Sequence, residues 1–410
     1  MMALSAKDQS SPQSPNLTNG FGLYFHIPFC VHKCSYCDFY SFTRYAMEDF
    51  ERLIARMRRE LTEAHATCTE RWGAFPPVTS IFVGGGTPSL LPPRFIEDLL
   101  RCAAELFSVS PDVEISMEAN PETVNDRFVA ELAETSINRI SLGAQSFKSQ
   151  HLNILERLGS AESIRKAVSL LRGAGFHNYN LDLIASIPGQ STEAFLDDIQ
   201  EALKLSPSHL SFYTLTLKPE HPLAAALPDS ETAADQYEAG VQFLTGQGFQ
   251  QYEISNFSLP GKNCRHNLLY WTGGDFLGIG PSAASRLFRE GQFYHRKQKA
   301  HFATYLESAF EAVPFEGSTP MQTVLEAAFL ELRTNVGVEL PLFRERYAYD
   351  LTASARFTDF LDEGLLELDG SRLRLSDKGR LLADSITSEL VDESLVLRDR
   401  PSPPFVSADI

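Results

Sequence analysis

The stretch Tyr24-Phe25-His26-Ile27-Pro28-Phe29-Cys30-Val31-His32-Lys33-Cys34-Ser35-Tyr36-Cys37 places three cysteines within eight residues. It begins in a β-rich run, residues 23–27, so the spacing C-x3-C-x2-C predicts a loop that leaves a strand. The whole chain has six cysteines in 410 residues, too few for a disulfide scaffold. Thiolate sulfur is a ligand that zinc and iron–sulfur centres share. The motif therefore predicts a metal centre with Cys30, Cys34 and Cys37 as its ligands.

Two kinds of metal centre fit these thiolates. A structural zinc site needs four ligands, and Cys68, Cys102 and Cys264 are isolated in the sequence. His26 or His32 could complete a zinc site, but His26 lies at the apolar end of the strand and would have to turn against it. A cubane held by three thiolates leaves one iron open to an outside ligand. Because no fourth cysteine lies near these three in the sequence, a [4Fe–4S] cluster is favoured over zinc.

Around the cysteine loop, the sequence alternates short β-rich runs with amphipathic helices as far as about residue 257. Apolar residues at helical spacing mark residues 47–61 and two later segments. This alternation predicts an α/β fold with a parallel sheet and right-handed crossovers. Unusual residues follow nearly every strand, which favours a barrel-like ring of strands over an open doubly wound sheet with one switch point. The predicted strands are 23–27, 80–83, 113–117, 139–142, 179–184 and 209–215.

After about residue 316 the pattern becomes mainly helical and is typical of a winged-helix-like module. No basic stripe accompanies it, so packing against the main domain or a protein partner is favoured over DNA binding. The predicted helices are 321–333, 339–347, 353–363 and 377–390, and the strands are 365–368 and 372–375. The predicted division is a disordered tail over 1–20, a barrel domain over 21–300, a C-terminal helical domain over 301–395 and a tail over 396–410.

The bulk composition excludes several partners. The formal net charge is −17, whereas nucleic-acid binding depends on Lys and Arg neutralising phosphates. No apolar stretch approaches the ~20 residues that span a bilayer, and the polar N-terminal residues lack a secretory h-region. We therefore expect a cytoplasmic protein with no nucleic-acid partner and no stable membrane insertion.

Polar residues follow the predicted strands where a barrel would gather them. Gly84-Gly85-Gly86-Thr87 lets a ligand approach the backbone closely, although alone it is also an ordinary glycine-rich turn. It is not a phosphate loop, because no Lys follows. Glu118 ends the third strand, and Asp182 lies between Leu181 and Leu183 in the fifth. Buried polar groups need partners, so a shared polar ligand would explain them.

In this order, the motifs resemble the radical S-adenosylmethionine superfamily, and within it the oxygen-independent coproporphyrinogen oxidase family. The resemblance covers about residues 23–390 and implies an incomplete (β/α)6 barrel with a helical C-terminal domain. It rests on the cysteine motif with Tyr36 before the third cysteine, Gly84-Gly-Gly-Thr-Pro-Ser89, Ser116-x-Glu118-Ala-Asn-Pro121, Ser141-Leu-Gly-x-Gln145-Ser-Phe147, Asp182-Leu-Ile-x-x-Ile-Pro-Gly-Gln190, Tyr252-Glu-Ile-Ser-Asn-Phe257 and His266-Asn-Leu-Leu-Tyr270-Trp271. It implies S-adenosylmethionine contacts at Tyr24, Gly84, Gly85, Gly86, Thr87, Glu118, Gln145, Arg157 and Asp182.

Two branches of that family differ just after the third cysteine. The dehydrogenase branch has a fourth cysteine at the position of Phe39, so this chain resembles the HemW-like, haem-chaperone branch. There the H-N-x-x-Y-W segment implies haem contacts at His266, Asn267 and Tyr270, with His266 as an axial ligand. The alternative is a structural histidine that is hydrogen-bonded in a loop. Three positions depart from the branch pattern: Gly159 and Ala284 replace histidines, and Lys218 replaces a Glu.

The resemblance implies a protein that binds the cluster, S-adenosylmethionine and haem and passes haem to an acceptor protein. An electron donor resembling flavodoxin or ferredoxin would serve the cluster. The runner-up function is oxidative decarboxylation of coproporphyrinogen III in porphyrin biosynthesis. A radical enzyme that methylates or opens haem and a zinc-stabilised binding protein are further alternatives. The sequence leaves open whether the radical is used.

Overall fold

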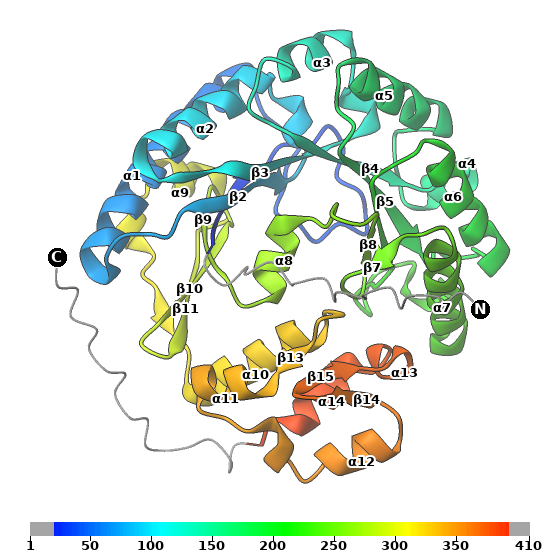
Figure 1. The fold of residues 1–410 in the computed structure, drawn as a ribbon. Helices are drawn as coiled ribbons and strands as arrows, with labels where there is room; N and C mark the ends of the chain where they lie inside the picture. The colour runs from blue at the N-terminus through cyan, green and yellow to red at the C-terminus, as the bar shows by residue number, and fades with distance from the viewer. Residues whose placement is uncertain (1–19, 393–410) are drawn as a thin grey trace, which may run out of the picture.

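The fold is a curved sheet wrapped by helices, with a smaller helical unit beneath it (Figure 1). The computed structural model describes residues 20–392; the predicted tails lie outside these residues, except for Gly20. Six strands run parallel in chain order, and β6 pairs with β5 and β8 rather than closing onto β1. The predicted incomplete barrel is therefore confirmed. These strands are β1 (Phe21–Ile27), β2 (Val78–Gly85), β3 (Val109–Ala119), β4 (Arg139–Gln145), β5 (Tyr179–Ala185) and β6 (His209–Thr214).

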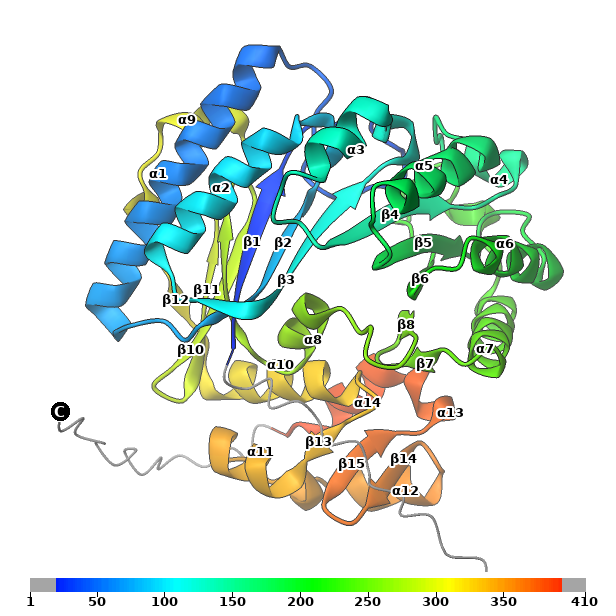
Figure 2. The same ribbon diagram turned by 45° about the horizontal axis from the view of Figure 1, so that its top comes forward.

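Side chains alternate across this sheet, as the pleat of a strand requires. On β1, Leu23, Phe25 and Ile27 are fully buried against the helices, while Tyr24 and His26 face the barrel interior. The helices lie outside the sheet and cover its apolar face (Figures 1 and 2). They are α1 (Met47–Trp72), α2 (Pro93–Leu106), α3 (Asp126–Leu132), α4 (Ser149–Ile154), α5 (Ala161–Gly173), α6 (Thr192–Lys204) and α7 (Ser230–Gly246).

Strands that the sequence did not predict extend the sheet at both edges. β9 pairs in parallel with β1, and β10 and β11 form an antiparallel hairpin beyond it. A fully buried ion pair, Glu60–Arg296 at 3.2 Å, joins α1 to this hairpin. The added elements are β7 (Gln250–Gln251), β8 (Asn256–Ser258), β9 (Asp275–Ile279), β10 (Ala284–Arg289), β11 (Gln292–Lys297), β12 (Glu316–Gly317) and the helix α9 (Phe302–Glu307).

The C-terminal unit has a hydrophobic core of its own. Its helices surround a three-stranded sheet of order β13-β15-β14, in which β13 was not predicted. Tyr305 and Phe310 instead pack with the barrel core, so the segment just after residue 300 belongs to the barrel by its contacts. The elements are α10 (Pro320–Leu332), β13 (Val338–Glu339), α11 (Leu340–Tyr347), α12 (Phe357–Asp362), β14 (Leu366–Asp369), β15 (Arg372–Leu375), α13 (Asp377–Arg380) and α14 (Ala383–Leu390).

Two of the predicted C-terminal helices are wrong in extent. Residues 353–363 do not form one helix, because Ser354 hydrogen-bonds locally, accepting from the Arg356 amide, and α12 begins only at Phe357. Residues 377–390 are split into α13 and α14 at Leu381 and Leu382. Short 3-10 helices cover Pro88–Leu90, Pro121–Thr123, Ala224–Ala226, Phe310–Ala312 and Leu351–Ala353.

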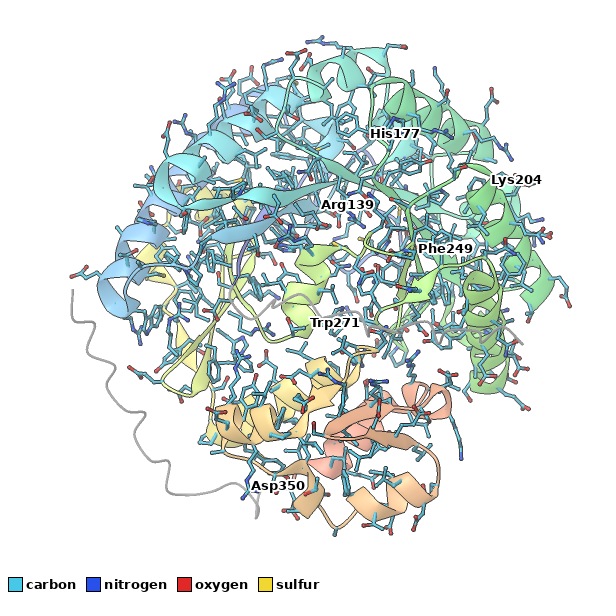
Figure 3. All side chains as sticks on the ribbon, in the orientation of Figure 1. Arg139, His177, Lys204, Phe249, Trp271 and Asp350 are labelled. Carbon is cyan, nitrogen blue, oxygen red and sulfur yellow. The ribbon has the colours of Figure 1, made fainter. Side chains whose placement is uncertain are left out.

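One short helix, α8 (Arg265–Trp271), lies inside the curve of the barrel sheet rather than outside it (Figure 2). It contacts β1 and β2 on one side and α10 of the C-terminal unit on the other. In Figure 3, Trp271 at its end points toward that unit, whereas Arg139 lies within the barrel. Over residues 20–392, no helix is both long and apolar enough to cross a bilayer.

Candidate functional site

The cysteine loop lies between β1 and α1 and is tied back on itself. The Cys30 amide donates to the Phe42 carbonyl at 3.0 Å, and the Phe42 amide donates to Pro28 at 2.9 Å. Cys30 and Cys34 are buried and Cys37 is partly exposed. All three thiols are free. The loop thus holds three unpaired thiols at the carboxyl end of β1, where a barrel places its chemistry.

The glycine run is fixed directly against this loop. The Gly86 amide donates to Ile27 and the Thr87 amide to Phe29, both at 2.7 Å. The Thr87 hydroxyl lies 3.5 Å from the Cys30 sulfur and donates to it. A Cβ at Gly86 would stand 2.6 Å from the Phe29 carbonyl oxygen and 3.0 Å from the Cys30 sulfur. Glycine is therefore required here by close packing, and the run and the loop form one unit.

A second chain of contacts reaches Cys34. Arg157 Nη1 lies 3.9 Å from the Cys34 sulfur, and Arg157 Nη2 donates to Asn120 Oδ1 at 3.0 Å. Asn120 Nδ2 in turn donates to the Thr87 hydroxyl at 3.1 Å. Asn120 was quoted in a motif but not predicted as a site residue. Its position two residues after Glu118, where β3 ends, was the signal that could have identified it.

The barrel interior behind the loop is polar. Glu118 accepts from the Gly85 amide at 3.0 Å, and Asp182 accepts from Ser141 at 3.0 Å and from Asn180 at 2.8 Å. Burial, together with the Asp182 carboxylate, raises the pKa of Glu118 to about 8. Burial also raises the pKa of Asp182. Two carboxyl groups held in one interior favour a ligand that brings positive charge or hydroxyl donors.

This raised pKa predicts a pH dependence. Between the ordinary value near 4.5 and about 8, the unfolded chain releases a proton that folded Glu118 keeps. The contribution of Glu118 to stability therefore falls as the pH rises from 5 to 8, by up to about 1.4 kcal/mol per pH unit. Glu118→Gln removes this dependence, so its unfolding free energy relative to wild type should increase with pH. Urea denaturation of the two metal-free proteins at several pH values measures these unfolding free energies. A difference between variant and wild type that does not change with pH would contradict the prediction.

Tyr24 and His26 hold each other on β1. His26 Nε2 lies 2.9 Å from the Tyr40 carbonyl, which can only accept, so Nε2 carries the proton. The Tyr24 hydroxyl then donates to His26 Nδ1 at 3.0 Å. Burial lowers the pKa of His26, in keeping with this neutral form. His26 is thus occupied in positioning the end of β1 and is not available to the thiols as a zinc ligand.

The geometry of the donors can be tested against a metal. Over residues 20–392, no three His, Cys, Asp or Glu side chains converge on a point that would hold one ion. A tetrahedral zinc ion draws its sulfurs to within about 4 Å of one another, since each Zn–S bond is ~2.3 Å. A cubane binds each thiolate through a different iron and accepts wider spacing. Three free thiols on one short loop have the donor chemistry that such a cluster would need.

The residues predicted to bind haem lie elsewhere, on α8. His266 is buried, its Nδ1 lies 2.9 Å from the Ser80 hydroxyl and its Nε2 lies 2.7 Å from the Tyr270 hydroxyl. Burial lowers the pKa of His266 to about 3. Ser80 lies near the start of β2, five residues before Gly85 at its end, which corresponds to about 17 Å along the strand. Phe82 connects the two groups of predicted site residues, because its ring stacks with that of Tyr24 at 6.4 Å and with that of His266 at 5.4 Å.

The structure shows the local surroundings of the three departures from the branch pattern. A Cβ at Gly159 would stand 1.9 Å from Glu122 Oε1, so the Glu122 carboxylate occupies that space. Lys218 pairs with Asp38 of the cysteine loop at 2.8 Å, with both side chains exposed. Ala284 is exposed at the start of β10. None of the three disturbs the contacts around the thiols.

Comparisons with known proteins agree with this geometry. Residues 24–202 match the Radical SAM superfamily, and residues 319–382 match the HemN C-terminal domain. The fold resembles that of coproporphyrinogen III oxidase (HemN) from Escherichia coli, with a TM-score of 0.76 and 22% identity over 92% of this chain and 91% of that one. At that identity the likeness shows the fold alone. The fold and the cysteine loop define a radical SAM protein.

Relatives identified by sequence assign the chain to one family within this superfamily. "Heme chaperone HemW" of Escherichia coli (strain K12) is 39% identical over 320 residues, 75% of this chain and 83% of the relative. "Heme chaperone HemW" of Mycobacterium tuberculosis (strain CDC 1551 / Oshkosh) is 35% identical over 383 residues, 90% of this chain and 95% of the relative. The chain belongs to the HemW family of the radical SAM superfamily.

Proposed function

We propose that this chain holds a [4Fe–4S] cluster through Cys30, Cys34 and Cys37, binds S-adenosylmethionine beside it, and acts as a haem chaperone that transfers haem to an acceptor protein. The observation that carries the proposal is the unit formed by the cysteine loop and the glycine run. Phe39 stands at the position where the oxidase branch has a fourth cysteine, which favours the chaperone branch. The names of the relatives support the haem-chaperone role. A cytoplasmic location and a flavodoxin- or ferredoxin-like electron donor are part of the proposal.

Each group around the loop has a separate task in this proposal. The bound cluster would supply one electron and an open iron to a sulfonium ligand. Gly84, Gly85 and Gly86 expose backbone groups to that ligand, and Glu118 and Asp182 accept from its donors. Arg157 places positive charge 3.9 Å from the Cys34 sulfur. Tyr24, Thr87 and Gln145 remain predicted contacts.

Incubation with haem or with coproporphyrinogen III distinguishes the proposed haem-chaperone function from the alternative function, oxidation of coproporphyrinogen III. The protein is reconstituted anaerobically with iron and sulfide and incubated with S-adenosylmethionine and either haem or coproporphyrinogen III. We expect stable haem uptake, passage of that haem to an apo-haemoprotein, and no porphyrinogen turnover. Formation of protoporphyrinogen IX together with 5′-deoxyadenosine would contradict the chaperone proposal and support the oxidase.

The role of His266 is tested by a matched pair of variants. His266 and His209 are both buried and both use their two ring nitrogens, His209 with Asn180 at 2.7 Å and Tyr252 at 2.8 Å. Replacing either histidine with alanine leaves its buried hydroxyl or amide partners unpaired and should cost about 1–3 kcal/mol of unfolding free energy. If His266 is an axial ligand, only His266→Ala weakens haem binding and shifts the haem absorbance. Equal effects of the two variants on haem binding would assign His266 a structural role.

A further inference from the structure

A carboxylate lies behind the turn that follows β4, where the apolar core of the barrel would ordinarily continue. Asp198 on α6 is completely buried, and it shares the core-facing side of this helix with Phe195, Ile199 and Ala202, which are equally buried. A carboxylate at such a position is unfavourable unless hydrogen bonds replace its lost hydration. Asp198 therefore needs a structural or functional explanation, which the proposed chemistry of the thiols does not provide.

All the contacts of this carboxylate are to the segment directly after β4. Ser146 Oγ donates to Asp198 Oδ2 at 2.6 Å, and the Phe147 amide donates to Oδ1 at 2.7 Å. The Ser146 oxygen also accepts from the Lys148 amide at 3.1 Å, and His151 Nδ1 lies 3.8 Å from Asp198. Ser146, His151 and Asp198 have the composition of a hydrolase triad. Since all three are buried and Ser146 donates straight to the carboxylate, the cluster instead fixes a turn.

That turn begins directly after Gln145, whose backbone is unusual. Gln145 is the last residue of β4, with φ of +66°, and the pairing with β5 shifts register between Gly143 and Gln145. A left-handed backbone is unfavourable for a residue other than glycine and persists only where the surroundings impose it. A register shift of this kind re-aims a side chain. The two residues after Gln145 are the two that Asp198 holds.

The re-aimed side chain lies on the inner face of the barrel beside the proposed cofactor site. Gln145 Nε2 is 2.9 Å from the point that a Cβ of Gly143 would occupy, and Asn120 Oδ1 and Arg157 Nη2 lie 3.3 and 3.6 Å from the same point. Arg157 and Asn120 belong to the chain of contacts that links Cys34 to Thr87. The Gln145 amide thus joins this polar group only if its backbone stays in the left-handed turn.

We propose that Asp198 is a positioning residue for S-adenosylmethionine, which acts through Gln145 by fixing Ser146 and Phe147 behind it. The inference rests on the proposed function, in which Gln145 contacts this cofactor. Asp198 touches neither the thiols nor the barrel interior, so its loss should change cofactor binding and leave the loading of the cluster intact.

A binding titration of the cluster-loaded protein tests the inference. We expect Asp198→Ala to weaken S-adenosylmethionine binding about tenfold, the effect of losing one well-placed polar contact. Iron and sulfide content should match wild type. Asp198→Asn keeps an acceptor for the Phe147 amide, so its affinity for S-adenosylmethionine should lie between those of wild type and Asp198→Ala. In a Gln145→Ala background, Asp198→Ala should cause little further weakening, because both changes remove the same contact. Wild-type affinity in Asp198→Ala, or effects that multiply in the double variant, would overturn the inference.

Hydrogen exchange tests the same inference without the cofactor. Asp198→Ala, or Asp198→Asn if the alanine variant does not fold, should speed amide exchange at Phe147 and Lys148 about tenfold. Gln236→Ala is the matched control, since buried Gln236 accepts from the Ser186 amide at 3.0 Å in the turn after β5. Gln236→Ala should speed amide exchange only in the turn after β5. Unchanged exchange at Phe147 in both Asp198 variants would overturn the inference. Failure of wild type to bind S-adenosylmethionine would instead refute the proposed function.

Discussion

Cys34→Ala is expected to abolish the metal centre. Two thiolates cannot hold a cubane that depends on three, so anaerobic reconstitution should leave less than about a tenth of the wild-type iron and sulfide per chain. The Arg157 guanidinium, 3.9 Å from this sulfur, would lose this contact at the same time. Iron and acid-labile sulfide analysis, with the visible absorbance of the reconstituted protein, measures the loss.

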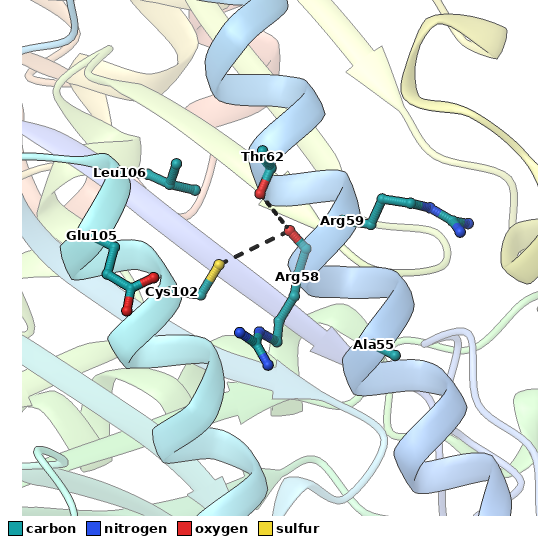
Figure 4. A pocket seen from close by; sticks show the side chains of 7 residues that line it. All are labelled: Ala55, Arg58, Arg59, Thr62, Cys102, Glu105 and Leu106. Atoms are coloured by element: carbon teal, nitrogen blue, oxygen red, sulfur yellow. Dashed lines mark hydrogen bonds between the residues drawn. The ribbon is translucent and has the colours of Figure 1, made fainter.

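The matched control for this variant is Cys102→Ala. Cys102 is buried like Cys34, but it lies on α2, at a cavity of about 350 Å³ between α1 and α2 that is also lined by Arg58 and Glu105 (Figure 4). Its sulfur lies 4.0 Å from the Arg58 carbonyl and far from the cysteine loop in sequence. Cys102→Ala should load the cluster as wild type does. Full loading of Cys34→Ala, or equal losses in both variants, would refute the assignment of the ligands.

Gly86→Ala is expected to have the second largest effect. The new methyl group would stand 2.6 Å from the Phe29 carbonyl oxygen and 3.0 Å from the Ile27 oxygen, and both are backbone atoms that cannot swing aside. The glycine run would have to separate from the cysteine loop, with the loss of the hydrogen bonds at 2.7 Å from Gly86 and Thr87. Overpacking of this kind costs about 1–3 kcal/mol, and we expect cluster loading to fall severalfold.

Gly173→Ala is the control for that substitution. Gly173 ends α5, and a Cβ there would meet nothing within 4 Å. Alanine is the better helix former, so this variant should be as stable as wild type or slightly more so. Thermal unfolding and iron content are measured for both variants. Normal loading in Gly86→Ala would show that the run is not fixed against the thiols as the structure has it.

Much of the barrel could be predicted because local pattern and architecture agree. On β1 the apolar positions alternate with Tyr24 and His26, and the cysteine loop follows at once. The same arrangement of a short strand followed by unusual residues recurs down to Asp182. Parallel strands in a barrel present their carboxyl ends on one face. Because the cysteine loop and the glycine run follow two successive strands, their contact could be predicted from the sequence.

Other features depend on contacts that no local pattern carries. β9 pairs with β1 across the whole barrel sequence, joining Phe21 to Asp275. The Glu60–Arg296 pair likewise links distant segments. His266 could be identified as a candidate ligand, yet its burial against Ser80 became visible only once α8 was placed inside the sheet. Its partner Tyr270 was within reach of sequence reasoning, because residues four apart on a helix share one face.

In the proposed function, the chain holds a cubane at three corners and leaves one iron for an outside ligand. Electron paramagnetic resonance of the reduced, anaerobically reconstituted protein, recorded with and without S-adenosylmethionine, tests this arrangement. We predict the signal of one [4Fe–4S] cluster per chain whose g-values shift when the cofactor is added. A protein that takes up zinc in place of iron, or a cluster signal identical in the two samples, would contradict the account.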